Sequence, residues 1–461
     1  MISGVEYGKS FAQYVNLLDF TGVNGSVPSG TLISDGTFLY GMTTMGGVKD
    51  AGVIFKIRSD GIGYEALLNF SDINGSAPYG SLISDGTFLY GMTAKGGKNG
   101  YGVIFKIRPD GTRYSKLLDF NASNGATPKG SFFYDGTFLY GMTSQGGINN
   151  MGTIFKIRSN GSEYLKLLDF AGGNGSNPHG TLISDGTFLY GMTSSGGTNN
   201  VGTVFRIKPD GTGYNSFFNF AGTSNGNYPL GSLISEDGFF YGMTYQGGLN
   251  NLGVVFRIKK DGTGYSKLLD FAGNINGSHP MGSLISIENL LYGMTYNGGI
   301  MERGVLFKIK TDGNGYSKLY DFATNGITPI GSLFSDSSFL YGMASQGGIN
   351  NMGALFKYAL VNTGTSWYSE KDGAQTYINV YPTLSSGKFT VEMCLKALNI
   401  ECTREGLLVK VEIYNVSGEK VYDNINNQTS KEIDLNDFAN GMYFVKIYDG
   451  DNVHLEKIVK Q

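Results

Sequence analysis

Several residue types that often define a site are scarce in this chain. Its 461 residues include two cysteines, three histidines and one tryptophan, and only 16% of them are charged. The sequence has no metal-binding cluster of His or Cys and no nucleophile motif of the G-x-S-x-G type. No apolar run approaches the ~20 residues that a membrane-spanning helix needs. The sequence therefore offers little support for metal chemistry, for nucleophilic catalysis or for a transmembrane segment.

A surplus of basic charge is also absent. Residues 1–360 carry 25 basic and 24 acidic side chains, and residues 361–461 carry 10 and 14. Neither part has the excess of Lys and Arg that binding to a phosphate backbone requires, so we expect no nucleic-acid partner. The amino-terminal segment MISGVEYGKSFAQ lacks a charged start followed by an apolar stretch, and it predicts no signal peptide.

Glycine and aromatic residues are abundant instead, with 72 Gly, 30 Tyr and 30 Phe. Their placement is periodic, because the tripeptide Tyr-Gly-Met recurs seven times at intervals of 49 to 51 residues. The copies begin at Tyr40, Tyr90, Tyr140, Tyr190, Tyr241, Tyr292 and Tyr341. A fixed period of this length indicates one supersecondary unit that is used seven times.

Each unit reads as four short strands. In the first unit these are Thr31–Ser34, Thr37–Thr43, Val53–Arg58 and Tyr64–Phe70. Asp35-Gly36 between the first two is a strong hairpin signal, for which we expect positive φ at both turn residues. Four antiparallel strands per unit are typical of a β-propeller blade.

The ends of the repeat predict a closed ring rather than an open array. The strand motif YxxLLxF occurs first at Tyr14–Phe20, before any Tyr-Gly-Met, and the last repeat ends near Tyr358 without such a strand. Residues 14–20 therefore supply the missing fourth strand of the seventh blade, and closure removes exposed sheet edges. We predict an all-β chain with a seven-bladed β-propeller over residues 1–360.

Beyond residue 360 the period is lost. Residues 361–376 read as a polar linker that carries the only tryptophan, Trp367. Residues 377–461 show alternating strands typical of a small antiparallel β-sandwich. Cys394 and Cys402 lie in this second domain, where a disulfide and two buried free thiols are both compatible with the sequence.

Two parts of the chain resemble known families. The repeat core LYGMTxxGGxxxxGxxFKIxxDGxxYxxLLxF, over residues 14–358, resembles the GloVer tandem repeat of bacterial surface and secreted proteins. The tail, with Val411–Gly418 and Asn440–Ile447, resembles the type A C-terminal sorting domain of the type IX secretion system of Bacteroidetes. This second resemblance implies a secreted or outer-membrane surface protein whose residues 377–461 contact the secretion machinery.

We expect ligands on one face of the ring. The loops NGxxPxG and xxGGxxxxG on that face are longer and vary between repeats, whereas the opposite face has tight Asp-Gly turns. Aromatic and amide side chains on these loops suit stacking on sugars or peptides and hydrogen bonding to them. The candidate binding residues are Tyr79, Lys95, Gln145, His179, Tyr245, Gln246, Tyr296 and Gln346.

The sequence predicts a monomer that binds glycan or protein without catalysis. The alternative is an extracellular polysaccharide lyase or hydrolase, in which Asp50, Asp72 or Glu302 works with Tyr245 or His279. A structural spacer without a specific ligand is the third interpretation.

No cofactor is predicted for the chain. Oxygen ligands at Asp19, Asp119 or Asp169, each near an Asn-Gly pair, could bind calcium. The spacing of these residues matches no recognised calcium-binding loop, so calcium is the weaker of the two interpretations.

Overall fold

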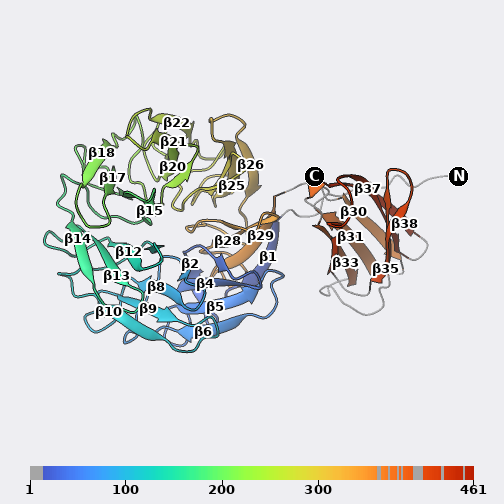
Figure 1. Ribbon diagram of the computed structural model, residues 1–461, viewed down its shortest axis with the longest axis horizontal. Helices are drawn as coiled ribbons and strands as arrows, with labels where there is room; N and C mark the ends of the chain where they lie inside the picture. The colour runs from blue at the N-terminus through green and yellow to red at the C-terminus, as the bar shows by residue number, and fades with distance from the viewer. Residues whose placement is uncertain are drawn as a thin grey trace. The chain divides into compact units, whose positions relative to one another are not determined.

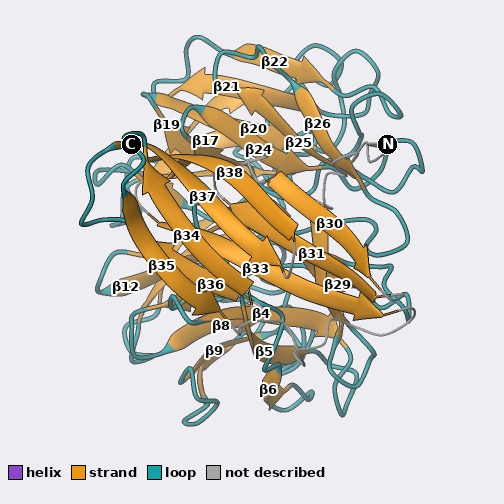
Figure 2. Ribbon diagram, turned by 90° about the vertical axis from the view of Figure 1, so that its right-hand side faces the viewer, coloured by secondary structure: helices purple, strands orange, loops and turns teal. Residues whose placement is uncertain are grey.

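The computed structural model describes residues 14–360 and, in the tail, residues 365–371, 374–381, 384–385, 388–397, 409–426, 430–449 and 452–460. The chain divides into two units, a propeller and a tail sandwich, and each is described by itself. Within the described residues every regular element is a β-strand (Figure 2). Among these residues no helix has the length and hydrophobicity to span a bilayer.

Seven antiparallel sheets of the described residues surround a common axis (Figure 1). The first strands, nearest the axis, are β3 (Ile33–Ser34), β7 (Ile83–Ser84), β11 (Phe133–Tyr134), β15 (Ile183–Ser184), β19 (Ile234–Glu236), β23 (Ile285–Ile287) and β27 (Phe334–Ser335). The second strands are β4 (Phe38–Met45), β8 (Leu89–Thr93), β12 (Phe138–Thr143), β16 (Leu189–Thr193), β20 (Phe239–Thr244), β24 (Leu290–Met294) and β28 (Phe339–Ala344). The third strands are β5 (Val53–Arg58), β9 (Val103–Ile107), β13 (Thr153–Arg158), β17 (Thr203–Ile207), β21 (Val254–Lys259), β25 (Val305–Lys310) and β29 (Ala354–Ala359). The outer strands are β6 (Glu65–Asn69), β10 (Ser115–Asp119), β14 (Leu165–Asp169), β18 (Asn215–Asn219), β22 (Ser266–Asp270), β26 (Ser317–Asp321) and β1 (Tyr14–Asp19), and the short β2 (Ser26–Pro28) adds to the first blade beside β4.

The ring is closed by its amino-terminal strand, as predicted. The seventh blade has the strand order β1-β29-β28-β27, so the first strand of the chain is hydrogen-bonded beside one of the last in the ring. The backbone N–H of Phe20 also donates to the carbonyl of Gly353 at 3.0 Å. The seven-bladed propeller and its closure by residues 14–20 are confirmed.

Aromatic contacts join each blade to the next in the same way. The Phe that ends each outer strand meets the Phe of the following blade's third strand edge to face, with ring centroids 5.3–5.6 Å apart. The pairs are Phe20–Phe55, Phe70–Phe105, Phe120–Phe155, Phe170–Phe205, Phe220–Phe256, Phe271–Phe307 and Phe322–Phe356. Because the series runs around the whole ring, the amino-terminal strand makes the same aromatic pair, Phe20–Phe55, as the other outer strands make.

The glycine of each Tyr-Gly-Met is required by the blade's own phenylalanine. Gly41 pairs with Phe55 across β4 and β5, and a Cβ at Gly41 would lie 2.5 Å from the Phe55 ring. Met42 is buried nearby, with 2% of its surface exposed. The repeated Gly therefore leaves room for a ring that then packs against the preceding blade.

The Asp-Gly turns differ from the prediction in their backbone. In the first blade only Gly36 has positive φ, at +91°, and Asp35 does not. Asp35 instead accepts hydrogen bonds from the backbone N–H of Thr37 and Phe38 and from the Tyr40 hydroxyl. Both turn residues reach positive φ in the fifth blade, at Asp237 and Gly238. The expected two-residue geometry is thus wrong for the first blade, because the aspartate serves as a side-chain acceptor.

The tail forms two sheets packed on one core. One sheet contains β30 (Thr365–Lys371), β31 (Ala374–Tyr381), β33 (Lys388–Ala397) and β36 (Ser430–Asp434). The other contains β32 (Leu384–Ser385), β38 (Asn452–Lys460), β37 (Gly441–Asp449), β34 (Val409–Asn415) and β35 (Lys420–Asn426). Buried residues of both sheets, among them Val391 and Ile447, form a single hydrophobic cluster. The predicted sandwich is confirmed, with one parallel pair, β32 with β38.

Two details of the tail differ from the sequence expectation or escape it. The segment 361–376, interpreted as a linker, contains β30 and the start of β31, which pair along their whole length. Cys394 lies in β33, while Cys402 lies outside the described residues.

Candidate binding face

The two ends of the propeller carry different connections. We call loop face the end with the connections from outer to next first strand and from second to third strand, and turn face the opposite end. In the first blade the loop-face connections lie between β1 and β3 and between β4 and β5. The turn face carries the tight turns, such as Asp35-Gly36.

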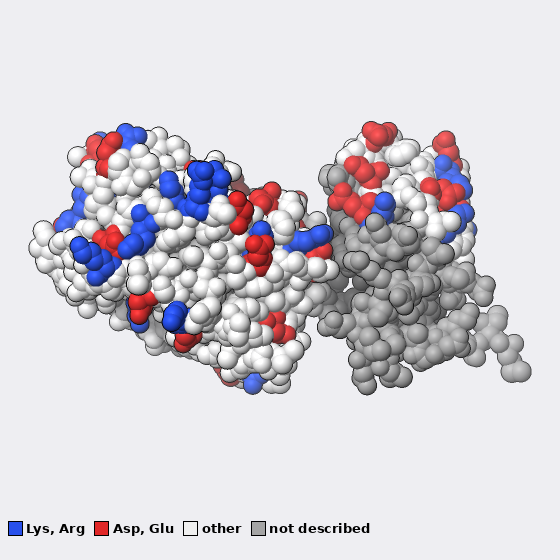
Figure 3. Space-filling model, turned by 90° about the horizontal axis from the view of Figure 1, so that it is seen from below, with Lys and Arg blue, Asp and Glu red and all other residues white. Residues whose placement is uncertain are grey.

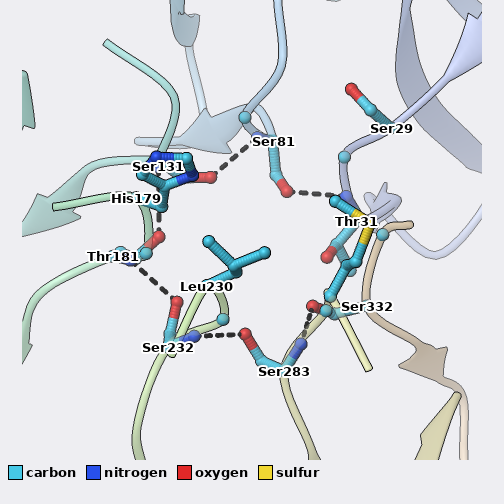
Figure 4. A pocket seen from close by; sticks show the side chains of 18 of the residues that line it. Ser29, Thr31, Ser81, Ser131, His179, Thr181, Leu230, Ser232, Ser283 and Ser332 are labelled. Atoms are coloured by element: carbon cyan, nitrogen blue, oxygen red, sulfur yellow. Dashed lines mark hydrogen bonds between the residues drawn. The ribbon is translucent and has the colours of Figure 1, made fainter. Parts of the chain in front are cut away.

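A cavity of about 360 Å³ opens where the loop-face connections meet around the axis (Figure 4). Its wall is built from one short segment of each blade, a variable residue followed by Gly and Ser or Thr. The variable residues are Ser29, Tyr79, Lys129, His179, Leu230, Met281 and Ile330, and we call this set the axial ring.

Each segment requires a glycine because the corresponding segment of the next blade lies too close for a side chain. A Cβ at Gly130 would lie 2.2 Å from the carbonyl oxygen of Gly180, and a Cβ at Gly331 would lie 2.3 Å from that of Gly30. Each of the seven axial glycines faces its neighbour in this way, and the series returns to its start. Any side chain would therefore push two blades apart at the axis.

In six of the seven segments the hydroxyl that follows the glycine joins neighbouring blades. The backbone N–H of Thr181 donates to Ser232 Oγ at 2.8 Å, and that of Ser232 donates to Ser283 Oγ at 2.7 Å (Figure 4). Six such bonds run from Thr31 to Ser332. Sequence reasoning missed this function, although Ser or Thr follows the glycine in every repeat. These hydroxyls fix the positions from which the axial ring projects.

The axial ring has a polar arc and an apolar arc. Blades follow one another around the axis in chain order, so Ser29, Tyr79, Lys129 and His179 occupy consecutive places. Leu230, Met281 and Ile330 complete the circle, and Figure 4 shows Leu230 and His179 beside the opening.

Burial changes the acid–base properties of two polar members. Desolvation, and next the charge of Lys129, lower the pKa of His179 to about 3, so its imidazole is neutral at physiological pH. Burial also lowers the pKa of the Lys129 ammonium. The polar arc thus presents one partly desolvated cation with neutral hydrogen-bonding groups on both sides.

A second set of residues ties the loops of adjacent blades together through the backbone. The N–H of Val27 donates to the Met352 carbonyl at 2.9 Å, and its carbonyl accepts from Thr44 Oγ1 at 2.7 Å. Val27 and its counterparts all have φ between +51° and +56°, a strained conformation for β-branched residues. The counterparts are Ala77, Thr127, Asn177, Tyr228, His279 and Thr328.

The structure separates the eight predicted binding residues into two groups. Tyr79 and His179 line the axial cavity. Lys95, Gln145 and Gln346 are exposed at one corresponding position of the loops that follow the second strands. Tyr245, Gln246 and Tyr296 lie half-buried on the equivalent loops of the fifth and sixth blades. The prediction that all eight residues bind a ligand remains untested.

The Tyr245 ring lies beside a histidine. The rings of Tyr245 and His279 have centroids 4.9 Å apart at 47°. Burial lowers the pKa of His279 and the nearby Glu302 carboxylate raises it, with a net decrease. His279 Nδ1 is buried and has no hydrogen-bond partner within the described residues. Asp50, another acid considered for catalysis, caps its own loop by accepting from the Gly46 N–H at 2.7 Å.

Aliphatic side chains project from the tips of the loop-face connections. Eight of them are between 74% and 87% exposed, and we call them the aliphatic rim. The rim consists of Val23, Val48, Ile73, Ile148, Leu249, Ile275, Ile300 and Ile349. On the turn face the most exposed large apolar side chain among the described residues is Ile62, at 59%. Sequence reasoning did not separate these tips from buried aliphatic residues.

The carboxylates considered for calcium hold the loops in place. Asp119 Oδ1 accepts from the Lys98 backbone N–H at 2.7 Å and pairs with Lys116 Nζ at 2.9 Å. Asp169 makes the same contacts with Ile148 N and Lys166 Nζ. On the visible side of the propeller, Lys and Arg side chains are interspersed with Asp and Glu (Figure 3).

Comparison with known families agrees with both parts of the fold. A family model described as the Gloeobacter/Verrucomicrobia repeat matches residues 83–239 and 223–389, together more than half of the chain. The chain belongs to this repeat family. A model described as a secretion system C-terminal sorting domain matches residues 379–461. The protein is therefore exported to the cell surface or beyond, and a tail that matches this model implies an interaction with the secretion machinery.

Solved structures with a similar fold share little sequence with this repeat protein. One is the extracellular domain of a hybrid two component system from B. thetaiotaomicron, with 14% identity and a TM-score of 0.53 over 99% of this chain and 60% of that one. A second such domain from B. thetaiotaomicron has 12% identity and a TM-score of 0.50 over 97% and 57%. The chain thus spans less than two thirds of these structures, and the likeness concerns the fold. No curated protein matches the chain.

Proposed function

We propose that this surface protein binds a macromolecular ligand, a protein or a glycan, through the loop face of its propeller and without catalysis. The aliphatic rim carries the proposal, because apolar side chains exposed to this degree on one face mark an interaction surface. Single exposed apolar residues are ordinary, but here the eight most exposed aliphatic side chains of the described propeller residues all lie on the loops of one face.

A protein ligand fits the rim better than a glycan does. The centre of a protein–protein interface is apolar and is surrounded by polar residues. Ile148 or Ile349 could become part of such an apolar centre. A glycan is favoured by a different observation, the half-buried Tyr245 ring beside His279. Aromatic faces with a polar handle suit the stacking of sugars.

A photoreactive residue placed at Ile148 in the full chain tests the proposal on the cells that export the protein. We expect cross-linked adducts from this position and none from Thr137, an exposed turn-face position that serves as the control. Equal labelling from both positions, or none from either, would overturn a role of the loop face in binding a protein.

A glycan array with the full chain tests the second candidate. Saturable binding supports a glycan ligand if the double variant Tyr245→Ala with Tyr296→Ala loses it. The turn-face control Tyr134→Ala should keep it. Turnover of a bound polymer would instead support the enzyme interpretation. If the array shows no binding and no cross-link forms, the structural spacer is the interpretation that remains.

A further inference from the structure

The members of the axial ring vary from blade to blade, unlike the residues that follow them in the sequence. The flanking Gly and Ser or Thr recur in all seven blades, and so do the Phe pairs that join the blades. At the axial ring, in contrast, seven blades place seven different side chains around one cavity. The scaffold therefore holds chemically distinct groups at equivalent positions, which is what recognition of one asymmetric molecule requires.

We infer that the axial ring binds an organic carboxylate with an apolar body, such as an acylated aliphatic amino acid or the carboxyl-terminal residue of a polypeptide. The carboxylate would lie against Lys129, with Tyr79 and His179 as hydrogen-bond donors on either side. The apolar body would contact Leu230, Met281 and Ile330. The inference goes beyond the proposed function, since it names a ligand class for the centre of the loop face that does not depend on the aliphatic rim.

The polar arc fits an anion rather than a cation. Lys129 is partly desolvated by the loops around it, and a bound carboxylate would compensate its charge with a charge-assisted hydrogen bond. The Tyr79 hydroxyl is a donor within an exposed side chain, and the neutral His179 imidazole offers one N–H. Ser29 Oγ is already used, because it donates to the Tyr79 carbonyl at 2.9 Å.

The size and the apolar arc restrict the body of the ligand. A volume of about 360 Å³ lies at the lower end of the range for small-molecule sites, about 300–1,000 Å³. Three consecutive aliphatic or thioether side chains offer no hydrogen bonds, so a polar body would lose its hydration there. A single aliphatic or aromatic side chain matches both restrictions.

Calorimetry on the full chain with N-acetyl-leucine and N-acetyl-leucinamide tests the inference. These probes differ only in the carboxylate, and we expect the acid to bind at least tenfold more tightly. Lys129→Met should remove this preference and Lys129→Arg should keep it. Met281→Gln should weaken both probes, whereas Lys49→Met, at an exposed position outside the cavity on the same face, should change neither. Circular dichroism and melting temperature verify that each variant is folded.

Three results would overturn the inference. They are equal binding of the acid and the amide, a preference for the acid that persists in Lys129→Met, and the absence of binding to either probe. An octapeptide ending in leucine, free or amidated, separates the two sources of the carboxylate. Binding of the free peptide indicates a polypeptide terminus, and binding of the small acid alone indicates a free metabolite. Cross-links from Ile148 without carboxylate binding would overturn this inference and leave the proposed function intact. Carboxylate binding without cross-links from Ile148 would overturn the proposed function and leave this inference intact.

Discussion

On the turn face of the propeller, the first four blades repeat the same contacts. Asp35, Asp85, Asp135 and Asp185 each accept a hydrogen bond from the tyrosine five residues later. On the loop face the backbone is equally regular, with one series of axial glycines and one of hydroxyl links, but the projecting side chains differ from blade to blade. The same repeat has therefore kept its side-chain contacts in the tight turns, whereas on the loop face it keeps the glycines and the hydroxyl links and lets the axial side chains vary. Side chains freed from a structural role in this way can take on binding.

The largest difference between the faces should appear when glycines are replaced. Gly130→Ala should lower the free energy of unfolding of the propeller by more than about 3 kcal/mol, because its Cβ would meet the Gly180 carbonyl at 2.2 Å. Gly136→Ala on the turn face should cost only about 1–2 kcal/mol, for the backbone conformation at φ +94° alone. Denaturant unfolding of both variants measures the contrast. Equal losses would show that the axis can expand and that the ring is less tightly closed than the distances imply.

The hydroxyl links should give the next largest effect. Ser232→Ala leaves the Thr181 N–H without its acceptor and should lower the free energy of unfolding by about 1 kcal/mol. Ser232→Thr is the matched control, since Thr181 fills the same position in the neighbouring blade and accepts from Ser131 N at 3.1 Å. If both variants unfold like the wild type, solvent satisfies the N–H groups and the links contribute no net stability.

Much of this architecture can be read from the sequence because it is periodic. The Tyr-Gly-Met period predicts the blades, and the displaced strand Tyr14–Phe20 predicts the closure. The conformation of the Asp35 turn could not be read in the same way, because Asp-Gly fits a two-residue turn as well as a turn capped by the carboxylate. The sequence pattern alone also could not show that Ile148 is exposed while Ile154, six residues later, is fully buried.

The candidate site was only partly predictable for a related reason. The alignment of repeats identifies the loop positions that vary, and hence Tyr79 and His179, which line the cavity. It does not give their distance from the axis, which separates these two from Lys95 and Gln145. Nor does it show that His279 lies against Tyr245, since the two residues come from neighbouring blades and meet only when these blades pack together.

Acid should weaken the tight turns that an aspartate caps. Burial raises the pKa of Asp135, but hydrogen bonds from the N–H of Phe138 and Thr137 and from the Tyr140 hydroxyl outweigh it and give a net decrease. A carboxyl with a lowered folded-state pKa stabilises the fold fully above its unfolded value of about 3.9, and this stability is lost as the pH falls through the folded value. Asp135→Asn should therefore lower the melting temperature more at pH 7 than at pH 3.

The control for this titration is Asp72→Asn on the loop face, outside the tight turns. Melting curves at pH 7, 5 and 3 compare both variants with the wild type. A deficit of Asp135→Asn that stays constant down to pH 3 would mean that the amide disturbs the turn by its shape, and that the charge of Asp135 does not stabilise it.

We expect the smallest effect on stability from substitutions in the aliphatic rim. These substitutions are the sharpest test of the contrast between the faces, because they should change the exposed apolar surface and leave the stability unchanged. Ile148→Asn and Ile349→Asn replace side chains that are 82% and 87% exposed, and each should change the free energy of unfolding by no more than about 0.5 kcal/mol. The same substitutions should reduce the fluorescence of a dye that binds exposed apolar surface, and Ile62→Asn on the turn face should reduce it less. Residues that cost solubility and contribute no stability need another reason to be present, and contact with a ligand supplies one. A marked loss of stability at Ile148 or Ile349 would mean that the rim side chains pack within their own loops, and the two faces would then differ in shape alone.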